Sequence, residues 1–259
     1  TSLSERLRKI GNAATHLGNT VDAADNIVKQ GSVSRDDWGF VHRSLDALTG
    51  RIIKNRPDGV SVNDVFVTAL HLTIDEWNRE HGDPAEKISI MMPVNLRPRD
   101  WFYDVVGMYA LFESVETRET DRRMVGSALH KVANQTRYIK EKDKAVSFLE
   151  SLRLIPPETP VELRGQIAEF LRGPGHRLVD CAVLSNLGRV PEPTPRLGEE
   201  PGEIWFSPPT LSMIPVGVGV VTSEGTARVV LRHLLSHLGT KAGQDFADTY
   251  VEKLEEISG

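Results

Sequence analysis

The stretch Gly59–Arg99, GVSVNDVFVTALHLTIDEWNREHGDPAEKISIMMPVNLRPR, decides the fold. Its first part predicts a helix, because Ser61 is a favoured N-cap residue and apolar side chains then recur at helical spacing as far as Trp77. Glycine and proline follow in residues 81–84, HGDP, where a helix is expected to end. The next run, Lys87–Val94, is short and almost wholly apolar, as in a strand buried on both faces. Polar residues at the junctions mark where a site can form.

The rest of the chain alternates helical and strand-like patterns and predicts an α/β fold. Further strands are expected at Trp38–Leu45, Val105–Val115, Val179–Leu184, Glu203–Phe206, Met213–Val221 and Ala227–Leu235. Further helices are expected at Asp46–Lys54, Thr120–Lys142 and Phe246–Ile257, with one or two more within Ala145–Arg172. Helices early in the chain and strands clustered late favour a layered sandwich with a mixed β-sheet.

The pattern divides the chain into an arm and one larger unit. Residues 1–34 carry apolar side chains at steps of three and four, which predicts a helical arm that packs on its own domain or on a segment outside the chain. Residues 35–259 form the main unit, and residues 190–212 within it are expected to be a crossover or linker, of which the proline-rich stretch Val190–Gly202 has no regular structure of its own. Because the sequence starts without Met, we expect a processed product or a fragment.

Composition argues against several classes of protein. The chain has 259 residues and a formal net charge of −5, which gives no overall field for attracting nucleic acid. No stretch approaches the roughly 20 apolar residues of a membrane-spanning helix. The single cysteine, Cys181, rules out an intrachain disulfide, and its apolar neighbours predict a buried structural thiol. We therefore expect a cytoplasmic protein in a reducing compartment.

Two histidine patterns point to chemistry. His42 and Asp46 stand four apart in HRSLD, the arrangement in which one large class of acyltransferases presents its general base; a chance match is the alternative, because the chain has eight histidines. His233 and His237 are also four apart, but their surroundings read as a strand entering a loop, which separates them by about 13 Å. We therefore expect no metal site.

Three motifs resemble those of a known family, in the same order. Ser61–Asp64, SVND, opens an apolar helix and resembles the Asn-Asp motif of bacterial wax ester synthases/diacylglycerol acyltransferases. Pro93–Arg97, PVNLR, resembles their Pro-Val-Ser-x-Arg segment, and Val183–Gly188, VLSNLG, is similar to their Ser-Asn-Val-Pro-Gly stretch. The likeness runs from about Trp38 to the C-terminus. The same half-fold occurs in nonribosomal peptide condensation domains and other CoA-dependent acyltransferases.

The resemblance implies one lobe of a chloramphenicol acetyltransferase-like fold, in which two similar α/β lobes enclose a tunnel. The family's catalytic His-His-x-x-x-Asp-Gly belongs to the N-terminal lobe and does not occur in this sequence. The chain is therefore expected to be a C-terminal lobe that is inactive alone. The Asp-Phe-Gly-Trp-Gly segment of the wider superfamily is missing too, and the nearest region is Ile214–Gly219, IPVGVG.

The resemblance also assigns substrate-binding residues. Asn63 would face the tunnel, with a helix-end hydrogen bond as the alternative role. Ser185 and Asn186 would line the tunnel at a strand end, unless they serve only the turn that follows. Arg97 would form a structural ion pair or contact a phosphate of CoA or of a carrier arm. Ser212 would border the cleft on the side of the crossover.

The function implied by the resemblance is transfer of an acyl group from a thioester to an alcohol or amine, in lipid or natural-product biosynthesis. Acyl-CoA or acyl-phosphopantetheine would be the donor, and no permanently bound cofactor is expected. The expected partners are the N-terminal lobe of the same protein or a second copy in a homodimer, and a carrier protein. Two alternatives remain: a non-catalytic ligand- or carrier-binding module of the same fold, and a small acyltransferase that uses His42.

Overall fold

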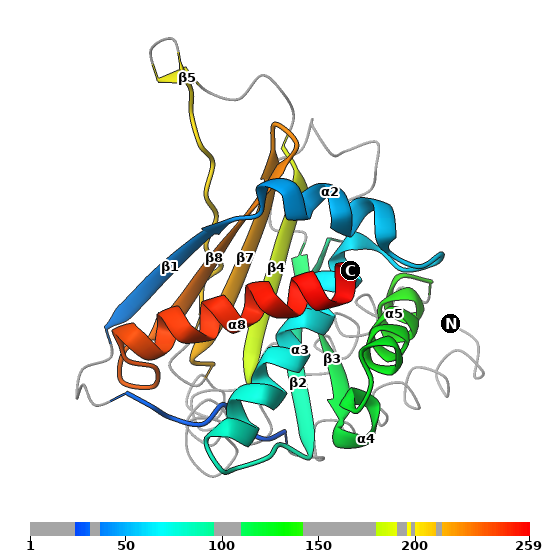
Figure 1. The fold of residues 1–259 in the computed structure, drawn as a ribbon, viewed down its shortest axis with the longest axis vertical. Helices are drawn as coiled ribbons and strands as arrows, with labels where there is room; N and C mark the ends of the chain where they lie inside the picture. The colour runs from blue at the N-terminus through cyan, green and yellow to red at the C-terminus, as the bar shows by residue number, and fades with distance from the viewer. Residues whose placement is uncertain are drawn as a thin grey trace, which may run out of the picture.

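A six-stranded mixed sheet forms the centre of the molecule (Figure 1). The computed structural model describes residues 24–31, 37–95, 110–141, 180–190, 196–197, 200–210 and 214–259. Its main sheet has the order β1-β8-β7-β4-β2-β3 and contains β1 (Trp38–Ser44), β2 (Lys87–Asn95), β3 (Ala110–Arg118), β4 (Ala182–Arg189), β7 (Val216–Ser223) and β8 (Thr226–Leu234). The central strands β2, β4 and β7 are parallel to one another, and the remaining neighbours are antiparallel. The predicted α/β fold with a mixed sheet is therefore confirmed.

Helices cover one face of this sheet. The described helices are α2 (Asp46–Asn55), α3 (Val62–Glu80), α4 (Glu119–Arg122), α5 (Val125–Glu141) and α8 (Thr240–Ser258). Figure 1 shows α3 and α8 crossing the sheet on one side, with α2 and α5 beside them. Alternate residues of β7 (Val216, Val218 and Val220) are fully buried in the core that these helices close. A separate two-stranded sheet, β5 (Arg196–Leu197) and β6 (Glu200–Pro201), stands away from the main sheet.

The N-terminus of α3 is fixed as the sequence predicts. Ser61 is the N-cap, and its hydroxyl accepts a hydrogen bond from the Asp64 N–H while the Asp64 carboxylate accepts one from the Ser61 N–H at 2.7 Å. The other carboxylate oxygen of Asp64 accepts a hydrogen bond from the Thr136 hydroxyl of α5 at 2.7 Å. The helix ends at Glu80, and Gly82 takes a positive φ of 80° immediately after it.

The face opposite the helices is crossed by an irregular segment, Glu203–Thr210, here called the strap. The strap lies directly on β7, because Gly217 and Gly219 have no side chains there. A Cβ atom on Gly219 would lie 2.1 Å from the carbonyl oxygen of Phe206. The strand expected at Glu203–Phe206 is therefore wrong: these residues pack across the sheet instead of pairing within it.

The described part of the N-terminal arm is not helical. Residues 24–31 have no regular secondary structure, although helical spacing was expected to continue to Gly31. They lie along the main unit instead: Ile27 is in the core, and Val28 accepts a hydrogen bond from the Trp77 indole at 3.1 Å. The Asn78 side chain binds the main chain of the same segment, and these partners favour an extended course. Residues 1–23 lie outside the described residues, so the division at residue 34 stays a prediction.

Several boundaries differ from those expected. The strand expected at Val179–Leu184 is β4, which begins at Ala182 and runs on to Arg189, and the strand expected at Met213–Val221 is β7, Val216–Ser223. The described part of the strand expected at Val105–Val115 is β3, which runs on to Arg118. The helix expected at Thr120–Lys142 is divided into α4 and α5, because the Arg122 side chain turns inward to bind Asp75. Helix α8 begins at Thr240 instead of Phe246. The helices expected within Ala145–Arg172 lie outside the described residues. No helix in the described part of the chain is long and apolar enough to cross a membrane.

Candidate functional site

The carboxyl ends of two parallel strands meet the N-terminus of α3. Strands β2 and β4 pair in parallel through Ile90 with Ala182 and Met91 with Val183, so both end at the same edge of the sheet. Asn63, in the first turn of α3, donates a hydrogen bond from its side-chain nitrogen to the Met92 sulfur at 3.1 Å. In open α/β sheets, ligands bind outside the carboxyl ends of the strands. We take this end of the sheet, where the carboxyl ends of β2 and β4 meet the start of α3, as the candidate site.

Asn186 lies within β4, three residues before the strand ends at Arg189. Its amide oxygen accepts a hydrogen bond from the Gly188 N–H at 2.8 Å, and Gly188 has a positive φ of 74°. The pairing of β4 with β7 changes register between Asn186 and Arg189. The turn role expected as an alternative is therefore present for the oxygen of Asn186, and its amide nitrogen remains available as a donor.

The alternation of side chains along β4 separates the two predicted residues of that strand. Leu184 is fully buried on the helix-covered face, so Asn186 lies on that face and Ser185 on the opposite one. Ser185 pairs with Gly219 across β4 and β7, which places it beside the strap, and only 9% of it is exposed. The structure therefore brings Asn63 and Asn186 to one face and places Ser185 on the other.

Two predicted residues, Arg97 and Ser212, lie outside the described residues, so their roles stay predictions. A residue that the sequence reasoning missed is Glu113 of β3. It pairs with Met92 in the antiparallel register, so it lies on the same face as Asn63, and only 7% of it is exposed. A carboxylate at an inward position of a predicted strand is the signal that could have identified it.

The His42 and Asp46 side chains have other partners. His42 is exposed on β1, and its ring packs edge-on against the Trp205 ring of the strap with centroids 5.1 Å apart. Asp46 is the first residue of α2, and its carboxylate accepts a hydrogen bond from the Ser44 hydroxyl at 2.9 Å. No contact between the two side chains occurs in the described structure, so the pair lacks the hydrogen bond that orients a general base.

His233, His237 and Cys181 have structural roles. The ring of His233 is packed against Gly39 and Gly243 and bonds to the Leu238 carbonyl oxygen at 2.7 Å; burial lowers its pKa. His237 bonds separately to the Ile27 carbonyl oxygen at 2.6 Å. Burial raises the pKa of the Cys181 thiol to about 12, as expected for a structural cysteine. Within the described residues, no group of three metal-binding side chains comes together.

A buried polar network fixes the opposite end of β2 and β3. The Arg122 guanidinium donates to Asp75 at 2.9 Å and to the Thr117 carbonyl oxygen at 2.8 Å. His71 bonds through Nδ1 to the Thr117 hydroxyl at 2.9 Å, while its Nε2 is buried without a partner in the described structure. Burial, with a smaller effect of Arg122, lowers the pKa of His71 to about 3. The imidazole is therefore neutral at pH 7.

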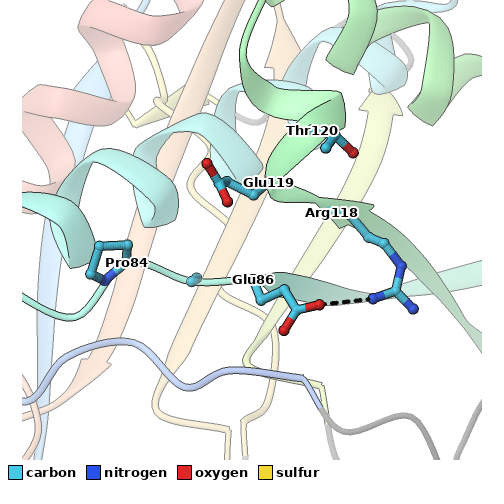
Figure 2. Close-up of a pocket in the computed structure, with 6 residues that line it drawn as sticks. Pro84, Glu86, Arg118, Glu119 and Thr120 are labelled. Atoms are coloured by element: carbon cyan, nitrogen blue, oxygen red, sulfur yellow. Dashed lines mark ion pairs between the residues drawn. The ribbon is translucent and has the colours of Figure 1, made fainter.

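A shallow hollow of about 390 Å³ lies at that same end of the sheet (Figure 2). Its lining residues precede β2 or lie at and after the end of β3: Pro84, Ala85, Glu86, Arg118, Glu119 and Thr120. Figure 2 shows Glu86 and Arg118 facing one another, and their charged groups are 3.6 Å apart. The hollow therefore lies at the amino end of β2, whereas Asn63 lies near its carboxyl end. It holds no residue of the candidate site.

Comparison with known sequences finds relatives without an assigned activity. The chain is 36% identical over 210 residues to the uncharacterised protein Rv2305 of Mycobacterium tuberculosis, and the match covers 78% of this chain and 48% of that protein. The protein MT2362 from another strain of M. tuberculosis matches equally well. The chain thus spans about half the length of the curated relatives it matches. No protein-family model matches the chain.

Comparison with solved structures shows the fold. The epimerization domain from the third module of tyrocidine synthetase B has a TM-score of 0.68 and 16% identity, over 98% of this chain and 55% of that one. The trichothecene 15-O-acetyltransferase of Fusarium sporotrichioides has a TM-score of 0.67 and 10% identity, over 99% of this chain and 54% of that one. The EpoB cyclization-docking bidomain of Sorangium cellulosum has a TM-score of 0.63 and 9% identity, over 95% of this chain and 48% of that one. This chain has the fold of the condensation-domain and CoA-dependent acyltransferase superfamily, as its motifs predict.

Proposed function

We propose that the chain is the C-terminal lobe of an acyltransferase of the condensation type, which transfers an acyl group from a thioester to an alcohol or amine. The observation that carries the proposal is the position of Asn63. Its side chain lies in the first turn of α3, against the carboxyl end of β2. The fold shared with an acetyltransferase and with nonribosomal peptide synthetase domains supports the same reaction class.

The hydrogen-bond donors at the start of α3 can stabilise a developing negative charge. The first turn of a helix carries unpaired N–H groups and a partial positive charge. The Asn63 amide adds a side-chain donor there, and its described partner, the Met92 thioether, is a weak acceptor that a substrate oxygen can replace. Donors aimed at the oxyanion of a tetrahedral intermediate lower the barrier to acyl transfer. Asn186 supplies a second amide on the same face of the sheet.

The general base in this proposal comes from outside the chain. A His-containing lobe belonging to a longer protein would supply it; a second copy in a homodimer would occupy the place of that lobe but would lack the His motif. The donor would be acyl-CoA or an acyl-phosphopantetheine arm on a carrier protein, and it would act as a substrate. The match over about half of each curated relative supports a longer parent protein.

The two alternatives differ in what they require of His42. A binding module of the same fold needs only the candidate site near Asn63. A small acyltransferase needs His42 as a base, yet His42 packs on Trp205 and Asp46 binds Ser44. The described geometry therefore favours the lobe or the binding module over the small enzyme.

The test is binding of octanoyl-CoA to the purified chain by calorimetry, with release of the CoA thiol measured alongside. Asn63→Ala should weaken binding about tenfold, the worth of one hydrogen bond. Gln244→Ala, which removes an exposed amide on α8, should leave binding unchanged. Equal affinities for the wild-type and Asn63→Ala chains would contradict the proposal. Thiol release that is lost in His42→Ala would instead establish the small enzyme.

A further inference from the structure

Strand β1 forms one edge of the sheet, and its main-chain groups alternate in direction. It pairs only with β8 within the described residues. The Leu235 N–H donates to the Asp37 carbonyl oxygen at 2.8 Å, and the Leu45 N–H donates to the Ala227 carbonyl oxygen at 2.9 Å. In an antiparallel pair the bonded positions alternate, so the odd-numbered residues of β1 bind β8. The N–H groups of the even-numbered residues, including Phe40, therefore point outward.

This edge lacks the protection that sheet edges usually carry. Natural edge strands discourage pairing with other chains through charged side chains, proline or bulges. Strand β3, at the other edge, carries Glu113, Glu116 and Arg118. The sequence of β1 is WGFVHRS, and its one arginine, Arg43, is held against α8 by Asp248 at 2.7 Å. Among the described residues, no other strand pairs with the outer edge of β1.

A guanidinium without an ion-pair partner among the described residues lies beside this edge, on an aromatic surface. The Arg232 guanidinium of β8 lies 4.2 Å from the Trp38 ring centroid and 5.7 Å from that of Phe40. Its Nε is buried without a hydrogen-bond partner, and no carboxylate in the described part of the chain pairs with it. By contrast, Arg228 on the same strand pairs with Glu203. Phe40 is 48% exposed, so the aromatic surface is open to solvent.

We propose that β1 is a docking edge for an extended acidic segment of a partner polypeptide. The segment adds a seventh strand: its main chain pairs with the outward groups of Phe40 and His42. One of its carboxylates reaches Arg232 and replaces the missing ion pair with charge-assisted hydrogen bonds. The His42 carbonyl oxygen already accepts a bond from the Arg43 side chain at 2.9 Å, which would yield to the incoming strand. We expect an acidic partner because a carboxylate is the natural partner of the Arg232 guanidinium, which has no ion pair among the described residues.

The test uses the synthetic peptide Ac-VEVEVEV-NH2, which alternates carboxylates with β-branched residues, and the control Ac-VKVKVKV-NH2. The acidic peptide should bind and slow amide hydrogen exchange at Phe40 and His42, while Val41, already bonded to β8, stays unchanged. Arg232→Gln should weaken binding about tenfold. The matched variant Arg51→Gln, which changes an exposed arginine on α2, should bind as the wild type does.

Three results would each overturn the proposal: equal binding of the lysine peptide, unchanged affinity in Arg232→Gln, or unchanged exchange at Phe40 and His42. The variant Phe40→Ala provides a second measurement, because it removes the exposed Phe40 ring and leaves Trp38 and the charges unchanged. It should weaken binding and leave exchange at Val41 as in the wild type. All of these readouts concern β1. They are independent of thioester binding near Asn63, so either proposal can fail without the other.

Discussion

Asn63 and Asp64 are adjacent in the sequence, yet their side chains have different roles. The Asp64 carboxylate is buried and accepts hydrogen bonds from the α3 cap and from Thr136 of α5. These bonds fix the start of α3 and fasten it to α5. Asn63 is only half-buried and donates to a sulfur atom. The Asn-Asp pair thus combines a structural residue with one that a substrate can recruit.

The buried His71 makes folding sensitive to acid. Its pKa is lowered to about 3 in the folded chain, chiefly by burial and secondarily by Arg122, so the unfolded chain binds its proton first as the pH falls. This contribution to stability is fully present above pH 6.5 and is lost as the pH falls towards 3, by up to about 1.4 kcal/mol per pH unit. Urea unfolding from pH 7 to 5 should show that slope, and His71→Leu should reduce it; the part that remains includes His233 and His237, whose pKa values burial also lowers.

The control for this prediction is the comparison of the wild type with His71→Leu, because every other titrating group is present in both proteins. Asp180 has a raised pKa because it is buried, so its contribution runs in the opposite sense and is lost as the pH rises. Asp180 is present in both the wild type and His71→Leu, and the difference between the two isolates His71. Identical slopes in the two proteins would show that protonation of His71 does not limit stability in acid.

At the scale of elements, the strap and β7 depend on one another. Val216, Val218 and Val220 fill the core on the helix-covered side, and the glycines between them let the strap lie against the backbone on the other side. Trp205 fastens one end, because its ring packs on His42 of β1. Its indole N–H donates to Glu203 at 3.1 Å, and Glu203 in turn pairs with Arg228 of β8. The strap covers Ser185 as a result.

Adding a methyl group beneath the strap should destabilise the fold. In Gly219→Ala the Cβ would lie 2.1 Å from the Phe206 carbonyl oxygen, so the strap or the strand must move. We expect a loss of about 1–3 kcal/mol in the free energy of unfolding, measured by urea denaturation.

The matched control for that substitution is Gly50→Ala in α2, where a Cβ meets nothing within 4 Å. Alanine in a helix interior should raise the free energy of unfolding by about 0.5–1 kcal/mol. A Gly219→Ala chain as stable as the wild type would show that the strap does not rest on β7 in solution.

At the scale of the molecule, elements governed by local rules could be predicted and those governed by distant contacts could not. The Ser61 cap, the buried strand β2 and the hairpin of β7 and β8 follow from short-range patterns. The strap was expected to contain a strand, because its apolar residues resemble one; only Gly217 and Gly219, distant in sequence, show that it crosses the sheet.

The candidate site could be predicted only in part, because some of its residues are placed by local patterns and others by how the strands pair. The Asn-Asp motif identified Asn63, since the helix start is a local feature. The separation of Ser185 from Asn186 onto opposite faces depends on where β4 lies in the sheet. The position of Glu113 in a predicted strand is a local signal, but its place opposite Met92 depends on the pairing of β2 with β3, which the local pattern does not specify.

The measurement that tests the central claim most directly is amide shift mapping of the labelled chain during titration with octanoyl-CoA. The account predicts that the side-chain amide of Asn63 and the main-chain amide of Gly188, which bonds to Asn186, shift together as the ligand binds. Shifts confined to the hollow near Glu86 and Glu119, or no shift near Asn63 at any concentration, would contradict it.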